Sequence, residues 1–141
     1  MTLIFGTDAW AAALVVEINA SSEYRNAAAK WGDGFNGNLL LVFDADTTAP
    51  KTHALLVELG KGACRGASFV EGVAHPDAGF GLRAPFLVWK DVLTRKTLAA
   101  TAILTGKMKV EGDRMTLLKH TAAHRAFVSC AAALDTEFPS P

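Results

Sequence analysis

The chain has 141 residues, of which 50% are hydrophobic, and 14 basic residues balance 14 acidic residues at a pI near 6.9. A chain of this length can bury a full core, and we expect one domain that spans residues 1–141. Because there is no basic excess, the composition argues against nucleic-acid binding and against a polybasic segment that docks on membranes.

The sequence also indicates the cellular compartment of the protein. No apolar run approaches the roughly 20 residues that a membrane-spanning helix needs, so we expect no stable membrane anchor. The first residues lack the positive charge of a signal peptide. Two cysteines, Cys64 and Cys130, cannot form a disulfide framework, which is typical of a reducing compartment. We therefore expect a cytoplasmic protein.

The first forty residues predict two helices. Thr7 or Asp8 can cap a helix, since both side chains accept hydrogen bonds from free amides of a first turn. Trp10, Leu14 and Ile18 then recur every four residues and so lie on one face. A second, short helix follows a break that is rich in serine.

Four strands are expected next. The continuous apolar run of residues 39–43 is typical of a central strand that is covered on both faces. Residues 54–59, 63–70 and 80–84 predict three more strands, with a bulge at Gly66. We expect these four strands to form a meander, in which each strand lies beside the one before it.

Helices return after the fourth strand. A proline starts a helix that carries Phe86, Trp89 and Leu93 on one face. A second helix is predicted over residues 97–105, with Gly106 as its left-handed terminator.

One more strand and two more helices complete the prediction. Met108 and Val110 alternate with charged residues, as in a strand with one wet face. Asp113 can cap the next helix, and Phe127 and Ala131 mark a last one. Strands and helices are thus segregated along the chain. This order predicts an α+β fold with a five-stranded, mostly antiparallel sheet and helices over one face.

Two blocks in the second half of the chain form a specific pattern. Residues 80–93 read Phe-Gly-Leu-Arg-Ala-Pro-(x)₃-Trp-Lys-Asp-Val-Leu, and residues 105–113 read Thr-Gly-Lys-Met-Lys-Val-Glu-Gly-Asp. This pattern resembles the sterol carrier protein type two (sterol-binding domain) family. Residues 17–25 and 136–139 are similar to those of its small stand-alone bacterial members, so the resemblance spans nearly the whole chain. The chain departs from it at residues 94–98, which read Thr-Arg-Lys-Thr-Leu where relatives often have Gly-x-Leu-Asp-Pro.

The resemblance implies both a fold and a function. Family members have a five-stranded sheet and helices that enclose an apolar tunnel, and they bind fatty acyl chains, acyl-CoA, phospholipids or sterols. The expected partner is thus a hydrophobic small molecule or lipid, bound without a cofactor or a metal. Two alternatives stay open. The first is an interaction module that supports dimerisation, for example of two copies of this chain. The second is an accessory module that presents a substrate to a partner enzyme.

We predict that large apolar side chains line this cavity, since methionine and aromatic residues suit a promiscuous apolar site. The last predicted helix either covers the mouth of the tunnel or packs on the core. The predicted cavity residues are Trp10, Leu14, Phe80, Leu82, Phe86, Trp89, Leu93, Ile103, Met108, Met115 and Phe127.

Other patterns that could carry chemistry are incomplete, so we predict no catalytic residues and no enzyme. His120 and His124 lie four residues apart, but a zinc hydrolase motif needs a glutamate after the first histidine, and we expect an exposed or capping role. The two cysteines lack a nearby base and are predicted to be core residues. The glycines of residues 60–66 follow one predicted strand and run into another instead of a helix, which favours a hairpin turn over a dinucleotide loop.

Overall fold

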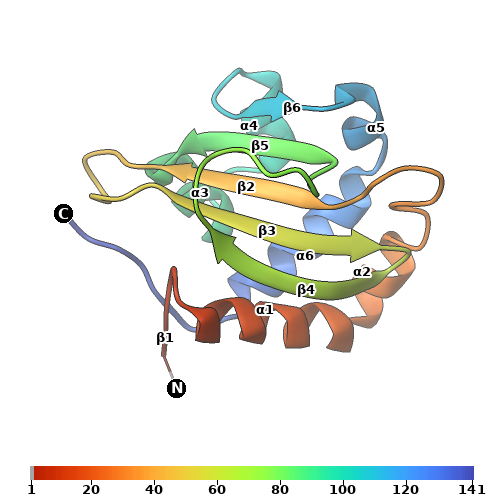
Figure 1. The fold of residues 1–141 in the computed structure, drawn as a ribbon, viewed down its shortest axis with the longest axis horizontal. Helices are drawn as coiled ribbons and strands as arrows, with labels where there is room; N and C mark the ends of the chain where they lie inside the picture. The colour runs from red at the N-terminus through yellow and green to blue at the C-terminus, as the bar shows by residue number, and fades with distance from the viewer. Residues whose placement is uncertain (1) are drawn as a thin grey trace.

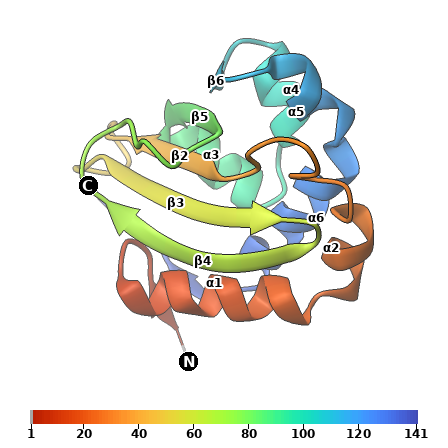
Figure 2. The ribbon, with the colours of Figure 1, turned by 45° about the vertical axis from the view of Figure 1, so that its right-hand side comes forward.

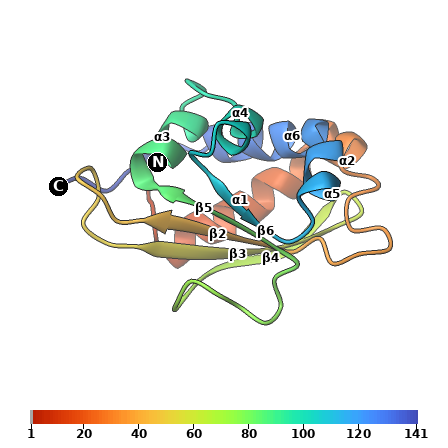
Figure 3. The same ribbon diagram turned by 90° about the horizontal axis from the view of Figure 1, so that it is seen from above.

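The structure is a computed structural model that describes residues 2–141. Its elements form two layers, a sheet and a set of helices that lie on one face of that sheet (Figure 1, Figure 3). In chain order the elements are β1 (Leu3–Ile4), α1 (Asp8–Ala20), α2 (Ser22–Ala27), β2 (Leu39–Asp44), β3 (His53–Gly60), β4 (Ala63–Val70), β5 (Phe80–Pro85), α3 (Phe86–Leu93), α4 (Ala99–Leu104), β6 (Lys109–Glu111), α5 (Arg114–Lys119), α6 (Thr121–Ala132) and β7 (Thr136–Glu137).

The main sheet confirms the predicted α+β class but not the predicted meander. Its five strands lie in the order β4-β3-β2-β5-β6, and all neighbours are antiparallel except β2 and β5, which are parallel. The fourth predicted strand therefore returns to pair with β2, with Leu39 opposite Phe80, instead of pairing with β4. A meander would leave the fully apolar β2 at an edge, where its unpaired backbone would invite aggregation.

The central strand β2 is covered on both faces, as its continuous apolar run predicts. Its odd-numbered residues face the helices and belong to the main core, whereas Leu40 and Val42 lie on the other face with Ala54 and Leu56. Ala78, from the loop between β4 and β5, packs on this second cluster. Figure 3 shows that loop on the side of the sheet opposite the helices.

Several local predictions are confirmed. Thr7 caps α1 by accepting a hydrogen bond from the backbone of Trp10, and Asp113 caps α5 in the same way. Gly106 has a φ of 79°, the left-handed conformation expected of a helix terminator. The register of β3 and β4 shifts beside Gly66, so the predicted bulge is present.

Lys61 and Gly62 form the turn of the hairpin that joins β3 to β4, and a strand, not a helix, follows them. Lys61 and Gly62 both have positive φ angles, 52° and 83°, as a tight two-residue hairpin requires. The hairpin prediction is therefore confirmed. Lys61 is exposed at the tip of this turn.

Two short strands were not predicted. β1 and β7 form a parallel two-stranded sheet in which Leu3 pairs with Thr136. The indole Nε1 of Trp10 donates a hydrogen bond of 2.9 Å to the Thr136 hydroxyl, which ties α1 to the same strand. Strands of two residues are too short to show a periodic pattern, so the sequence carries no signal for them.

The first helix closes one side of the interior. α1 lies along the edge strand β4, as Figure 2 shows, and its predicted face of Trp10, Leu14 and Ile18 is fully buried. The other helices follow on the same side of the sheet, so a space bounded by helices and strands lies between the two layers.

Within residues 2–141, no helix combines the length and the apolar character needed to span a lipid bilayer.

Candidate functional site

An apolar cavity of about 310 Å³ lies between the sheet and the helices. This volume is at the lower end of the range typical of small-molecule sites. Its floor is the inner face of the sheet, with Leu39, Leu41 and Phe43 from β2, Leu55 from β3 and Leu82 from β5. Residues of α1, α3, α4, α5 and α6, the α3–α4 connection and Met108 form the remaining walls.

Eight of the eleven predicted cavity residues line this space, and they come from elements spread over most of the chain. The fold thus brings together side chains from both ends of the sequence. The eight are Trp10, Leu14, Leu82, Trp89, Leu93, Ile103, Met108 and Phe127.

The other three predicted residues do not line the cavity. Phe80 packs against Trp31, with 5.0 Å between ring centroids, because the start of β5 lies beside the residues that precede β2. Phe86 is fully buried beside Phe5, since the first turn of α3 faces the β1 end of the core. Met115 is 65% exposed because the first turn of α5 faces solvent.

The floor residues on β2 and β3 were missed in the prediction, although a signal for them exists. Alternate residues of a strand face the same side of a sheet, so Leu39, Leu41 and Phe43 must share one layer once the strand is assigned. The sequence does not say which of the two buried faces is against the cavity. That choice depends on the helices that cover the sheet.

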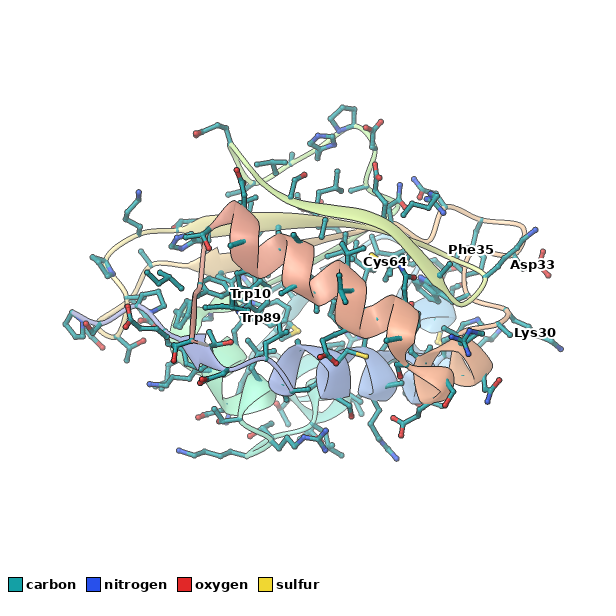
Figure 4. All side chains as sticks on the ribbon, turned by 90° about the horizontal axis from the view of Figure 1, so that it is seen from below. Trp10, Lys30, Asp33, Phe35, Cys64 and Trp89 are labelled. Carbon is teal, nitrogen blue, oxygen red and sulfur yellow. The ribbon has the colours of Figure 1, made fainter. Side chains whose placement is uncertain are left out.

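Two tryptophans present their ring carbons to the cavity while their N–H groups are satisfied elsewhere. Trp89 Nε1 donates a hydrogen bond of 2.8 Å to the backbone carbonyl of Val42, and its ring lies 4.6 Å from that of Phe43. Trp10 donates to a β7 hydroxyl, as described above. In the view of Figure 4 both Trp10 and Trp89 lie well away from Phe35, and both line the cavity. The cavity therefore gains aromatic surface without an unpaired donor.

The cavity reaches solvent between the α3–α4 connection and α6. The lining residues Arg95, Leu98 and Arg125 are exposed, and Leu98 retains 55% of its accessible surface. Thr97 and Thr121 also contribute to the lining here. The opening thus has a polar rim, whereas the floor is apolar. These rim residues lie outside the apolar patterns on which the predicted set was based.

His124 is a half-buried titratable side chain in the cavity wall, whereas the lining arginines are exposed. Its Nε2 lies 2.9 Å from the carbonyl oxygen of Leu117, which can only accept, so Nε2 carries a hydrogen. Its ring packs edge-on against Trp31 at 4.8 Å. Burial, with a smaller contribution from nearby His120, lowers the pKa of His124 to about 4. The ring is therefore neutral at pH 7. It is half-buried and not exposed, but its hydrogen bond to Leu117, one of the last carbonyls of α5, is the predicted capping role.

His120 lies at the junction of α5 and α6, and its side chain forms no capping hydrogen bond. Its ring instead packs edge-on against Trp31, with 5.2 Å between centroids. Both histidines thus contact the same tryptophan because they share one face of the helical segment. Among the described residues, no three histidine, cysteine or acidic side chains are grouped so as to hold a metal ion.

Both cysteines are buried, as predicted for core residues. Burial raises the pKa of the Cys64 thiol and also that of the Cys130 thiol. A thiol with a raised pKa is protonated at neutral pH and is a poor nucleophile.

Comparison with known proteins assigns the family. A model of the SCP-2 sterol transfer family matches residues 18–124. The chain belongs to this family. The SCP-2 family comprises domains that bind and transfer lipids and sterols. The resemblance predicted from the sequence is confirmed.

Solved structures of SCP-2 proteins share the fold. A crystal structure of sterol carrier protein 2 is 30% identical, with a TM-score of 0.79 over 92% of this chain and 98% of that chain. A conserved hypothetical protein from Thermus thermophilus, described as possibly a sterol carrier protein, is 31% identical, with a TM-score of 0.79 over 94% and 91%. Sterol carrier protein 2 from Yarrowia lipolytica, in its apo form, is 17% identical and shows the same fold, with a TM-score of 0.54 over 86% and 88%. No curated protein matches the sequence.

Proposed function

We propose that this SCP-2 protein binds a hydrophobic ligand, with a fatty acyl or sterol-like body, in the cavity between its two layers and carries it unchanged. The observation that carries the proposal is the apolar space of about 310 Å³ whose floor is built from strand residues. A module that served only for dimerisation or protein contact would need no such space, and its core would be filled. The cavity therefore favours a carrier over an interaction module.

The binding energy would come from removing apolar surface from water. Each methylene transferred into the cavity gains about 0.8 kcal/mol. Eight methylenes would thus gain about 6 kcal/mol, from which the cost of immobilising the chain is subtracted. A site of this kind discriminates length and bulk better than functional groups.

We expect the protein to bind its ligand without chemical turnover. The Nε2 of His124 is already engaged with the Leu117 carbonyl, and the two buried thiols have raised pKa values. Catalysis needs a nucleophile or a base within hydrogen-bond reach of an orienting group. Pure protein, assayed on acyl-CoA and p-nitrophenyl ester panels, should show no rate above the buffer blank. Turnover that disappears in a His120→Ala/His124→Ala double variant would refute this.

Occupancy of the cavity can be tested by blocking it. Ala100 lies on α4, is half-buried and lines the cavity, so Ala100→Trp places an indole in the space. We expect this variant to weaken binding of a fluorescent fatty acid at least tenfold. Ala122→Trp is the matched control, because Ala122 is exposed on α6 and does not line the cavity. Equal affinity in the wild type and both variants would contradict binding at this site.

Native mass spectrometry of freshly purified protein, followed by lipid extraction, would identify a ligand that copurifies. A bound mass that is present in the wild type and in Ala122→Trp, and lost in Ala100→Trp, would support the proposal. A ligand retained by Ala100→Trp must be bound elsewhere.

A further inference from the structure

Two arginines lie at the mouth of the cavity without an ionic partner. Arg95, in the α3–α4 connection, and Arg125, on α6, both line the cavity and are both exposed. Within residues 2–141, neither guanidinium forms a salt bridge or donates a hydrogen bond. Asp135 shares a small neighbouring depression with Arg95 but is hydrogen-bonded to the Thr2 hydroxyl instead. Two cations without an ionic partner among the described residues thus border the opening of an apolar cavity.

The backbone at Arg95 has a conformation that arginine does not favour. Arg95 follows the C-cap of α3 with a φ of 65°, and its N–H donates to the carbonyl of Val92. Glycine is the usual residue in this left-handed position, because its lack of a Cβ removes the steric penalty. An arginine here accepts local strain, which points to a use for its side chain.

The surroundings of the mouth are also basic. Residues 95–125 contain seven basic and two acidic side chains, although the whole chain is balanced at 14 of each. This segment forms α4, β6, α5 and the start of α6, and Figure 1 shows the first three of these elements together at one end of the molecule. A local excess of one sign attracts ligands of the opposite sign.

Free hydroxyl groups complete the polar rim. Thr97 and Thr121 line the opening, and neither side chain forms a hydrogen bond within the described residues. Inside the cavity, by contrast, the neutral ring of His124 supplies no positive charge at pH 7. A charged group on a ligand would therefore be stabilised at the rim and not in the interior.

We propose that Arg95 and Arg125 form a headgroup site that selects amphiphiles with an anionic head, with the apolar chain inside and the head at the mouth. Guanidinium groups bind carboxylates and phosphates through paired hydrogen bonds, so either head fits this chemistry. The inference rests on the proposed function, because the head is placed by a chain that occupies the cavity. It adds a preference for charge, which an apolar cavity alone does not have.

The test compares ligands that share one chain and differ in the head. Dodecanoate, dodecyl phosphate, dodecanol and dodecyltrimethylammonium, each below its micelle concentration, would compete with a neutral fluorescent probe. We expect both anions to bind about tenfold more tightly than dodecanol at low ionic strength, and this advantage to shrink as salt screens the exposed charges. The ratio of dodecanoate to dodecyl phosphate affinity distinguishes a free fatty acid from a phosphorylated lipid.

Variants then assign the preference to residues. Arg95→Gly and Arg125→Gln should each weaken binding of the anions about threefold, and the double variant should remove the advantage over dodecanol. Dodecanol affinity is the reference within each variant and should fall less than the affinity for either anion. Since glycine suits the backbone at position 95, Arg95→Gly should melt at the wild-type temperature or above it. Lys61→Gly is the matched control, because it removes a positive charge from a left-handed backbone position outside the cavity lining.

The outcomes separate this inference from the proposal on which it rests. If dodecanol binds and the anions show no advantage, or if the double variant keeps that advantage, the headgroup site is refuted and the carrier proposal stands. If none of the four ligands binds, the carrier proposal is refuted and the headgroup site with it. A loss of anion preference in Lys61→Gly equal to that in Arg95→Gly would assign the effect to net charge and refute the site.

Discussion

Replacing Trp89 by alanine should lower the free energy of unfolding by about 3–5 kcal/mol. The side chain is 4% exposed, packs on Phe43 and donates to the Val42 carbonyl, so it joins α3 to the central strand. The substitution removes this packing and leaves a buried carbonyl without its indole donor. In a chain of this size, the loss corresponds to a fall in melting temperature of about 10 °C or more.

Chemical denaturation of Trp89→Ala, beside a control on the same helix, measures this effect. Leu87 is 48% exposed on α3, and Leu87→Ala should change the free energy of unfolding by less than about 0.5 kcal/mol. A melting temperature of Trp89→Ala within about two degrees of the wild type would show that the indole does not anchor α3.

Acidification should destabilise the protein between about pH 6.5 and pH 4 through His124. Its pKa is lowered from 6.5 to about 4 in the folded state, chiefly by burial, whereas the unfolded chain takes up the proton near pH 6.5. Between these values the unfolded state binds more protons, so the free energy of unfolding falls as the pH falls. Above pH 6.5 this contribution is constant. Each pKa unit corresponds to about 1.4 kcal/mol, which gives a loss of about 3 kcal/mol across the window.

The measurement is the free energy of unfolding at several pH values for the wild type and His124→Gln. Glutamine can still donate to the Leu117 carbonyl but does not titrate, so the variant should show a flatter profile between pH 4 and pH 6.5. Burial also lowers the pKa of His53. The free energy of unfolding of both proteins therefore falls further with falling pH through His53. Parallel profiles for the wild type and His124→Gln would refute the assignment.

The parts of the fold that follow from short-range patterns could be predicted from the sequence. The four-residue spacing of Trp10, Leu14 and Ile18 marks the buried face of α1, and Gly106 and Asp113 mark a helix end and a helix start. Strand pairing could not be predicted in the same way. Periodicity identifies a strand but not its neighbour, so the parallel pairing of β2 and β5 has no local signal.

Some residues of the candidate site could likewise be predicted from the sequence, and others could not. Large apolar residues on strongly patterned helices, such as Trp89 and Phe127, line the cavity, and their contact with a ligand stays a prediction. α5 has only six residues, too few to define a face, and Leu117 is buried there instead of Met115. Arg95 and Arg125 gave no signal because exposed arginines are common on any surface. Their place at the mouth of the cavity could not be predicted, because the opening exists only in the folded chain.

The parallel pairing of β2 with β5 also limits the order in which the parts of the cavity can form during synthesis. Leu39 can pair with Phe80 only after the β3–β4 hairpin, which lies between them in the sequence, has been synthesised. α4 and α6 come later still in the chain. Contacts that close long loops form slowly, because the entropy of closure is lost before the contacts stabilise the structure. A growing chain on the ribosome therefore has the floor of the cavity and its α1 wall before it has the walls from α4 and α6. Under the proposed function, a ligand would therefore enter the folded protein after synthesis, through the gap between the α3–α4 connection and α6.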